Sequence, residues 1–294
     1  MKSLSCILLF VERGAGPYLG LSKALLLARH FGARLELLLC ETQHPVAPLT
    51  GNTSVAERAR AECIGEGERY LRALRHTIVS PDIEIGTEVV CAPSPVLGLA
   101  DKLRRAQVQI VVKAARVAAG LLGPLEWQLA TRCSAPLLLT AGRAWRATPR
   151  FAAALDLSEH AHARPGDQIV GLSEMLARRC GAELDYLYAA PTRGAGARTA
   201  SEAHRRLHAL LPAQQAGLGR LQYCSGEAAG VLPRLIARRD YDLLAVGTAS
   251  NPSGAACGAL TRALLQASAG DVLLVPAGVS AAGTLRRETE AMAG

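Results

Sequence analysis

Residues 247–261, GTASNPSGAACGALT, have the composition of a ligand-binding loop. The segment follows the apolar run LLAV at 243–246 and contains three glycines. Glycine lets backbone N–H groups approach phosphate oxygens and adopts positive φ readily. A hydroxyl such as that of Thr261, at the start of a helix, donates a further hydrogen bond to an anion. The chemistry that this segment indicates is therefore phosphate binding.

Patterns for catalysis or metal binding do not occur in the sequence. It has no Gly-x-Ser-x-Gly turn, Walker lysine loop or His-Glu-x-x-His helix, so we predict no catalytic residue and expect a protein that is not an enzyme. His160 and His162 lie in a polar segment without a nearby cysteine or acidic pair, which favours a solvated turn over a metal site. The eight cysteines are isolated from one another, as expected of reduced thiols in a cytoplasmic protein.

An internal repeat shows which elements must position the loop. LARHFGARLELLL at 27–39 recurs as LARRCGAELDYLY at 176–188, and PLLLTAG at 136–142 matches VLLVPAG at 272–278. Repeated segments in the same order indicate two copies of one domain. The predicted units are domain 1 at 1–142, domain 2 at 149–278 and a tail at 279–294.

Short aliphatic runs alternate with longer amphipathic stretches in both copies, which indicates β-α-β units around a parallel sheet buried on both faces. The predicted strands lie at 4–11, 34–41, 83–91, 108–113 and 136–140, and again at 150–156, 183–189, 219–224, 242–246 and 271–275. The predicted helices lie at 17–31, 54–77, 94–106 and 123–132, and again at 165–180, 199–211, 227–239 and 256–267. The fold class is therefore α/β, with two tandem, doubly wound, Rossmann-like domains of five parallel strands each.

Ligands on doubly wound sheets bind beyond the carboxyl ends of the strands, where the strand order reverses. In domain 2 this position belongs to Asp156, after the first strand, and to Gly247, after the fourth. The loop at 247–261 starts from this edge of the sheet. The sequence thus places one candidate site there.

The net charge of +8 raises the question of nucleic-acid binding. The pattern argues against it, because pairs such as Arg104–Arg105, Arg178–Arg179 and Arg238–Arg239 fall at predicted helix C-termini, where cations complement the helix dipole. Aromatic residues make up only 4% of the chain, too few for a base-stacking surface. No apolar run has the length of a membrane span. We therefore expect neither a specific nucleic acid nor a membrane as partner.

The order of these segments resembles the universal stress protein family, in particular its tandem two-domain members. The resemblance is carried by CILLFVE and FAAALD, by GARLELLL and GAELDYLY, and by YDLLAVGTAS followed by a helix and VLLVPAG. It covers roughly residues 5–278. The segment LEWQLATRCSAPLLLT, with Trp127 before a Cys-x-x-Pro ending at Pro136, resembles the E type most of all.

Nucleotide-binding members of this family carry a loop of Gly, two residues, Gly, nine residues, Gly and then Ser or Thr. In this register Gly247 takes the first glycine place, Ser250 the second and Leu260 the third, and Thr261 keeps the hydroxyl. Ser250 still offers a hydroxyl and an N–H, whereas the branched Leu260 would occupy phosphate space and resist positive φ. The resemblance also gives Asp156 the place of an acidic residue that contacts the nucleotide, with helix capping as its alternative role.

Domain 1 departs further from the family loop. Its three glycine places are taken by Ala114, Val117 and Trp127, its hydroxyl place by Gln128 and its acidic place by Glu12. We therefore expect no nucleotide in domain 1.

The resemblance implies a cytoplasmic, non-catalytic protein of the stress response, a binding or regulatory protein with degenerate nucleotide-binding loops and unidentified protein partners. No cofactor is expected in this interpretation. The alternative is an ATP-binding switch, in which Asp156, Gly247, Ser250 and Thr261 of the second domain alone hold ATP. Family members pair through their last strands, so 136–142 and 272–278 are expected to join the domains as an internal pseudo-dimer. A homodimer of the whole chain is a further expectation.

A dinucleotide-dependent enzyme is the rival from another class. Gly14 and Gly16 follow the first strand and Glu41 follows the second, as in a dinucleotide-binding fingerprint. Leu19 stands where the third glycine belongs, and the second copy has no glycine at this turn. The fingerprint is thus incomplete.

Overall fold

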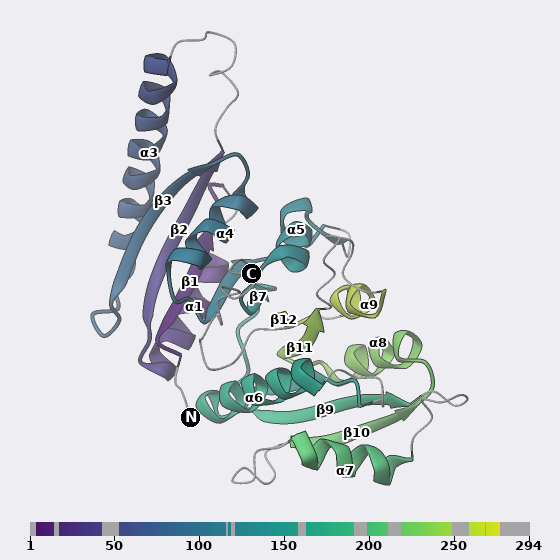
Figure 1. The fold of residues 1–294 in the computed structure, drawn as a ribbon. Helices are drawn as coiled ribbons and strands as arrows, with labels where there is room; N and C mark the ends of the chain where they lie inside the picture. Colours follow the sequence, from purple (N-terminus) through teal and green to yellow (C-terminus); the bar gives the residue numbers. More distant parts are fainter. Residues whose placement is uncertain are drawn as a thin grey trace, which may run out of the picture.

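The structure is a computed structural model, and it describes residues 4–14, 18–42, 53–115, 117–118, 121–157, 163–190, 199–210, 219–248, 259–267 and 269–276. Strands and helices alternate through both halves of the chain (Figure 1). The first half contains β1 (Cys6–Val11), α1 (Tyr18–Phe31), β2 (Arg34–Thr42), α3 (Thr53–His76), β3 (Ile85–Ala92), α4 (Pro95–Arg105), β4 (Ile110–Ala114), β5 (Val117–Ala118), β6 (Leu121–Leu122), α5 (Pro124–Arg132) and β7 (Leu137–Thr140). The second half contains β8 (Arg150–Ala154), α6 (Ala163–Cys180), β9 (Glu183–Ala190), α7 (Ala200–Leu210), β10 (Gly219–Ser225), α8 (Ala228–Arg239), β11 (Leu243–Thr248), α9 (Ala259–Ala267) and β12 (Asp271–Pro276).

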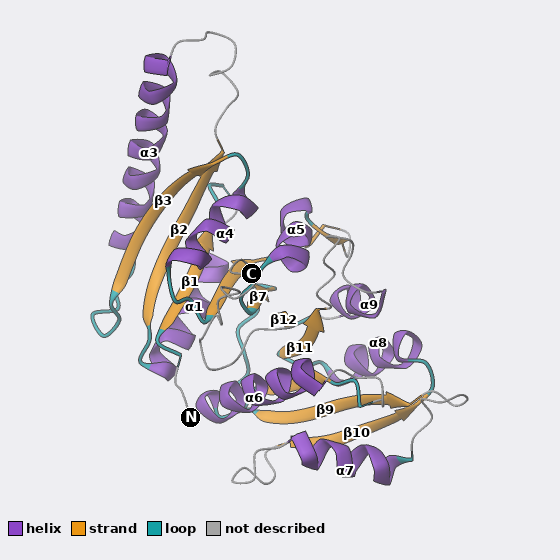
Figure 2. Cartoon of the chain, viewed as in Figure 1, coloured by secondary structure: helices purple, strands orange, loops and turns teal. Residues whose placement is uncertain are grey.

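The ten principal strands form one sheet in the order β10-β9-β8-β11-β12-β7-β4-β1-β2-β3 (Figure 2). Each half contributes five parallel strands, and the order within the two halves is the same when each is followed from its outer edge to the middle of the sheet. The predicted α/β fold class, with two tandem doubly wound units, is confirmed. Several element bounds differ from the prediction by one or two residues, as at β1, which begins at Cys6 rather than at residue 4. β5 and β6 form a small antiparallel pair that is too short to show a periodicity, and β8 ends at Ala154 rather than at residue 156.

The two halves meet where β7 and β12 pair antiparallel, with Val272 opposite Leu139 and Leu274 opposite Leu137. The paired residues lie within the segments 136–142 and 272–278 that were expected to pair. Because each strand has its own half on one side and the other half on the other, neither presents an open edge. The sheet is therefore continuous through the middle of the molecule.

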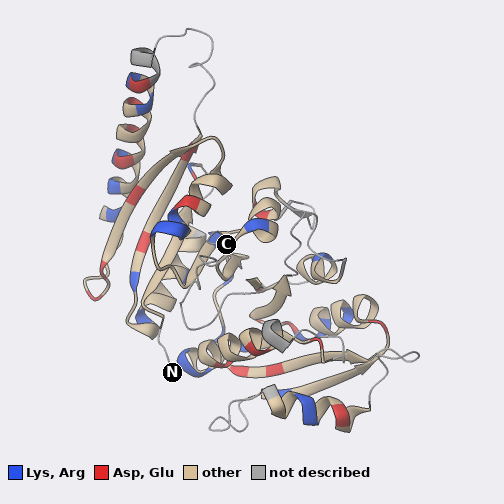
Figure 3. Cartoon of the chain, in the orientation of Figure 1, with Lys and Arg blue, Asp and Glu red and all other residues tan. Residues whose placement is uncertain are grey.

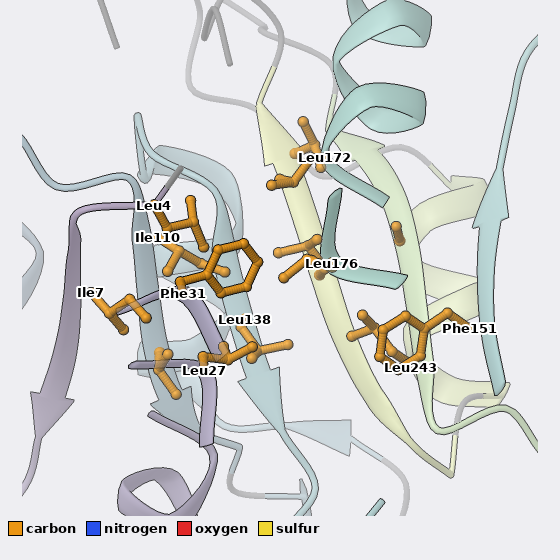
Figure 4. Close-up of a cluster of buried hydrophobic side chains, with 14 of the residues drawn as sticks. Leu4, Ile7, Leu27, Phe31, Ile110, Leu138, Phe151, Leu172, Leu176 and Leu243 are labelled. Carbon is orange, nitrogen blue, oxygen red and sulfur yellow. The ribbon is translucent and has the colours of Figure 1, made fainter. Parts of the chain in front are cut away.

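Both faces of the sheet carry a hydrophobic core that runs through the two halves. One cluster lies under α1, α3, α6 and α7, and Figure 4 follows it from Ile7 and Phe31 of the first half to Leu176 and Phe151 of the second. The other cluster lies under α4, α5, α8 and α9. Along β1 the side chains alternate between these two clusters, so the strand is buried on both sides. Because the strand is buried on both faces, its sequence is a continuous apolar run rather than an alternation of apolar and polar residues.

A buried polar cluster reinforces the junction between the halves. The Lys23 ammonium of α1 lies 3.2 Å from Asp271 Oδ2 on β12 and 4.0 Å from the centre of the Trp145 ring. The indole of Trp145 and the amide of Ala141 each donate a hydrogen bond of 2.8 Å to the Asp271 carboxylate. Burial lowers the pKa of Lys23 and raises the pKa of Asp271, and their mutual attraction opposes both changes. Residues of the first half, of the second half and of the segment that joins them are thus in contact within one buried cluster.

Helix ends follow the local signals of the sequence. Gly32 and Gly181 come directly after α1 and α6 with φ of +62° and +63°, which glycine adopts at helix C-termini without strain. The three arginine pairs lie in the last turns of α4, α6 and α8, as predicted. Among the described residues, no helix has the length and apolar character needed to cross a bilayer.

Candidate functional site

The candidate site of the second half lies at the carboxyl ends of β8 and β11. These strands are neighbours, with Ala154 opposite Val246, so the chain leaves both at the same edge of the sheet. Asp156 follows β8 by two residues and is exposed, whereas the flanking Leu155 and Leu157 are buried. Gly247 lies one residue beyond Val246, within β11. The structure therefore brings these two predicted residues to one edge.

Helix α6 packs closely against this strand at Gly247. A Cβ atom at this position would lie 3.0 Å from Cδ1 of Ile169, which is closer than ordinary van der Waals contact. The glycine thus has a packing role in addition to any ligand it accommodates.

The start of α9 closes over β11. Thr261 is buried, and its hydroxyl lies 3.4 Å from the carbonyl oxygen of Gly247, to which it donates a long hydrogen bond. Leu260, the residue expected to obstruct the phosphate space, is half-buried and packs against the hydrophobic cluster under α8 and α9. Ser250 lies outside the described residues, so its place in the site remains a prediction.

The equivalent edge of the first half is filled by charged side chains from its own elements. Lys113, at the end of β4, lies 2.7 Å from Glu12 Oε2 and 3.0 Å from Glu126 Oε1, and it donates a hydrogen bond of 2.7 Å to the carbonyl of Ala114. Side-chain exposure is 1% for both Lys113 and Glu126 and 21% for Glu12. A buried ammonium held by two carboxylates leaves little attraction for an external anion.

Glu126 stands where an anion would otherwise be favoured. It is in the first turn of α5, which begins at Pro124 after Gly123. Free N–H groups and the helix dipole stabilise negative charge at such a terminus. The negative charge at this helix N-terminus is thus supplied by the chain's own Glu126.

Comparison with solved structures gives the fold a name. A functionally unknown protein, PA1789, from Pseudomonas aeruginosa PAO1 is 22% identical, with a TM-score of 0.67 over 93% of both chains. A putative universal stress protein from Pseudomonas aeruginosa UCBPP-PA14 is 20% identical, with a TM-score of 0.62 over 93% of this chain and 94% of that chain. A universal stress protein from Archaeoglobus fulgidus DSM 4304 is 12% identical, with a TM-score of 0.70 over 92% of this chain and 98% of that chain. The chain has the universal stress protein fold.

Sequence comparison adds no relative at closer range. No family model matches the chain, and no curated protein matches it. The solved structures with this fold share between 12% and 22% of their residues with the chain. The fold alone does not assign a function, which depends on the chemistry of the site.

Sequence reasoning missed the charged cluster of the first half of this universal stress protein fold. The signal was present, because Lys113 is one of only four lysines and is the next-to-last residue of the otherwise aliphatic strand IVVKA. A charge at the end of a buried strand needs a partner. What the sequence did not reveal is that Glu126, 13 residues later, returns to supply it.

The structure also bears on the dinucleotide alternative. Glu41, the acidic residue that this alternative assigns to a ribose, lies at the end of β2 and pairs with Arg13 Nε at 2.6 Å. Arg13 stacks in addition on the ring of Tyr70, 5.7 Å from its centre. These contacts give Glu41 a structural partner within the chain. No group of three or more potential metal ligands is found among the described residues either.

Proposed function

We propose that this chain is a tandem universal stress protein that acts in the cytoplasm as a non-catalytic binding or regulatory protein of the stress response. The likeness in fold over nearly the whole chain supports this proposal. The observation that carries it is the difference between the two carboxyl edges. The first edge is closed by Lys113, Glu12 and Glu126, so ligand binding at such an edge is assigned to the second half alone.

The proposal includes an internal pseudo-dimer, in which the two halves replace the two subunits of a one-domain protein. The pairing of β7 with β12 supports it, as does the buried contact of Lys23 with Asp271. The partners of the assembled chain are then other proteins.

ATP binding by the second half is the further candidate. It is supported by the packing of half-buried Leu260 against the core, because a side chain held there leaves more room for phosphates. Gly247 and Thr261 are in addition already close together. In this candidate Asp156 contacts the nucleoside, and Gly247, Ser250 and Thr261 surround the phosphates.

Thermal unfolding in the presence of Mg-ATP tests both candidates. A ligand of the native state raises the midpoint in proportion to the logarithm of its concentration once that exceeds Kd. If the second half binds ATP, wild-type protein is expected to gain stability up to several millimolar Mg-ATP. Thr261→Val, which removes the hydroxyl, is expected to lose this gain, and Gln128→Val at the matching place of the first half is expected to keep it. Phosphate release is expected to stay at the level of ATP alone.

Each outcome separates the candidates. The absence of any shift in wild type excludes ATP and leaves a protein that regulates by protein partners alone. A shift appearing only in Leu260→Gly shows that Leu260 closes the site despite its contact with the core. Phosphate release above background contradicts the non-catalytic proposal itself.

A further inference from the structure

An open groove lies at the edge of the first half that is farthest from the junction. β3 is the last strand of the sheet and pairs with β2 on one side only, while α3 runs beside it (Figure 1). The groove between them has a volume of about 490 Å³. It is lined by Glu68, Arg72 and Arg75 of α3 and by Ile85, Thr87 and Val89 of β3. A sheet edge with room beside it can accept another strand.

The hydrogen-bonding groups of β3 that face this groove follow from its register. Leu35 lies opposite Ile85, and its amide donates a hydrogen bond of 2.9 Å to the carbonyl of Glu84. In a parallel pair, every second residue of a strand directs its N–H and C=O groups toward the neighbouring strand, and the residues between them direct these groups away from it. The outward groups therefore belong to Ile85, Thr87 and Val89. The side chain of Val89 faces α3, because a Cβ on Gly67 would lie 2.7 Å from its Cγ1.

We propose that this edge is where two copies of the chain associate, with β3 pairing antiparallel to β3 of the second copy about Thr87. A two-fold axis at Thr87 places each Thr87 opposite the other, and it places Ile85 opposite Val89 of the second copy. Threonine pairs and pairs of apolar β-branched residues are favourable across antiparallel strands. The residues opposite one another in this register are also those whose backbone groups point outward.

The charges along β3 and α3 fit the same register. Glu88 of one copy stands opposite Gly86 of the other, so no like charges face each other across the strands. Glu88 is moreover held by Lys102 at 2.6 Å and by Arg105 at 3.0 Å within its own chain. The carboxylate of this edge strand is thus already neutralised.

The outer stripe of α3 is complementary to itself. Glu68, Arg72 and Arg75 are spaced four and three residues apart, so they lie on one face of the helix. Gly67 of α3 lies over Val89 of β3, and Arg75 lies about two turns farther along α3, near Ile85. A two-fold axis at Thr87 exchanges the two ends of this stretch. It therefore brings Glu68 of one copy level with Arg75 of the other. Within the described part of the chain, none of these three side chains makes an ion pair. Figure 3 shows both signs of charge along α3.

A second copy fits this groove better than an acidic segment of another protein. The chain carries a net charge of +8, which by itself would favour an acidic partner. An acidic strand would satisfy Arg72 and Arg75 but would meet the carboxylate of Glu68. A second copy offers a cation to Glu68 and a carboxylate to Arg75 at once, as an isologous interface requires.

Sedimentation equilibrium of the full chain without ligand, from about 10 μM to about 1 mM, tests the proposal in the range where a small interface becomes populated. We expect a concentration-dependent dimer of the 30.9 kDa chain. Thr87→Pro removes an outward N–H that bonds to nothing inside the sheet, and it is expected to leave the monomer folded by circular dichroism while abolishing the dimer. Thr87→Val keeps the N–H and is expected to dimerise as wild type does.

Charge reversal tests the register itself. Glu68→Arg and Arg75→Glu each bring like charges together twice per dimer, and each is expected to weaken association about fivefold. The double variant Glu68→Arg/Arg75→Glu restores opposite charges and is expected to recover wild-type association to within about twofold.

Three results would overturn the inference. A monomer throughout the concentration range excludes association at this edge. A dimer that survives Thr87→Pro unchanged must form elsewhere. A double charge variant no better than either single variant rules out the pairing about Thr87.

Discussion

The two carboxyl edges of this molecule follow matching strands, but their side chains differ in charge. Lys113 stands opposite Phe10 in the first half, and Val246 stands opposite Ala154 in the second, so Lys113 and Val246 hold matching places. The first edge therefore contains a buried ammonium, and the second contains an aliphatic side chain. Glu12 and Asp156 are both acidic, but Glu12 is bound to Lys113 whereas Asp156 is exposed.

This difference shows how a duplicated domain can divide its tasks. A binding edge leaves polar backbone groups and a helix terminus for a ligand, which costs stability when the ligand is absent. The first half meets this need with Lys113 and Glu126 from its own chain. Its edge is complete without a ligand, and the proposed function therefore assigns binding to the second half.

The largest expected effect is that of removing the first-half ammonium. Lys113→Met removes the counter-charge of the buried Glu126 carboxylate, which is expected to cost about 3–5 kcal/mol of unfolding free energy. Urea denaturation measures this loss. The charge-free variant Lys113→Met/Glu12→Gln/Glu126→Gln is expected to be more stable than Lys113→Met alone. A loss below about 1 kcal/mol in the single variant would mean that the cluster contributes little to closing this edge.

The junction between the halves provides the next test. Lys23→Met leaves the buried Asp271 carboxylate without its ammonium partner, with an expected loss of about 3 kcal/mol at neutral pH. Burial raises the pKa of Asp271, so the folded state binds its proton more tightly than the unfolded state. The stability of Lys23→Met should therefore rise as pH falls from 7 toward 4, while Lys23→Met/Asp271→Asn shows no such rise. Equal pH profiles for the two variants would contradict this account.

A smaller effect is expected in the second half. Gly247→Ala places a Cβ 3.0 Å from Ile169 Cδ1, and relief of this contact is expected to cost about 1 kcal/mol. Gly247→Ala/Ile169→Val gives the methyl group room and is expected to recover part of the loss. If Gly247→Ala is as stable as wild type in urea denaturation, the packing role of this glycine is refuted.

The smallest effect distinguishes the two acidic residues. Asp156→Asn alters an exposed side chain and is expected to change stability by less than about 0.5 kcal/mol. Glu12→Gln removes a charged partner of buried Lys113 and is expected to cost about 1.5–3 kcal/mol. Both are measured by chemical denaturation without ligand. Similar losses for the two variants would erase the contrast between the edges.

The fold was predictable from the sequence because its signals are local and repeated. Aliphatic runs, the glycines that end α1 and α6, and the copy of 27–39 at 176–188 determine the strand and helix order. The β5–β6 pair was not predicted, because two-residue strands are too short to show a periodicity. The placement of Asp156 and Gly247 at one edge followed from the topology alone.

The chemistry of the edges was less predictable. It depends on which distant side chains meet, as Lys113 and Glu126 do, and on the direction in which a side chain such as Leu260 turns. Composition and spacing are the same whichever way Leu260 points. The β3 groove likewise depends on the separation of a helix from a strand, which no pattern in the sequence records.

The antiparallel contact of β7 with β12 has a consequence for how the chain unfolds. Separating the halves would uncover two central strands and divide both hydrophobic clusters, which extend through the two halves. Neither half can then melt while the other keeps its full core. Although the sequence is a duplication, heating is expected to give one cooperative transition, with a calorimetric enthalpy equal to the van't Hoff enthalpy for the entire molecule.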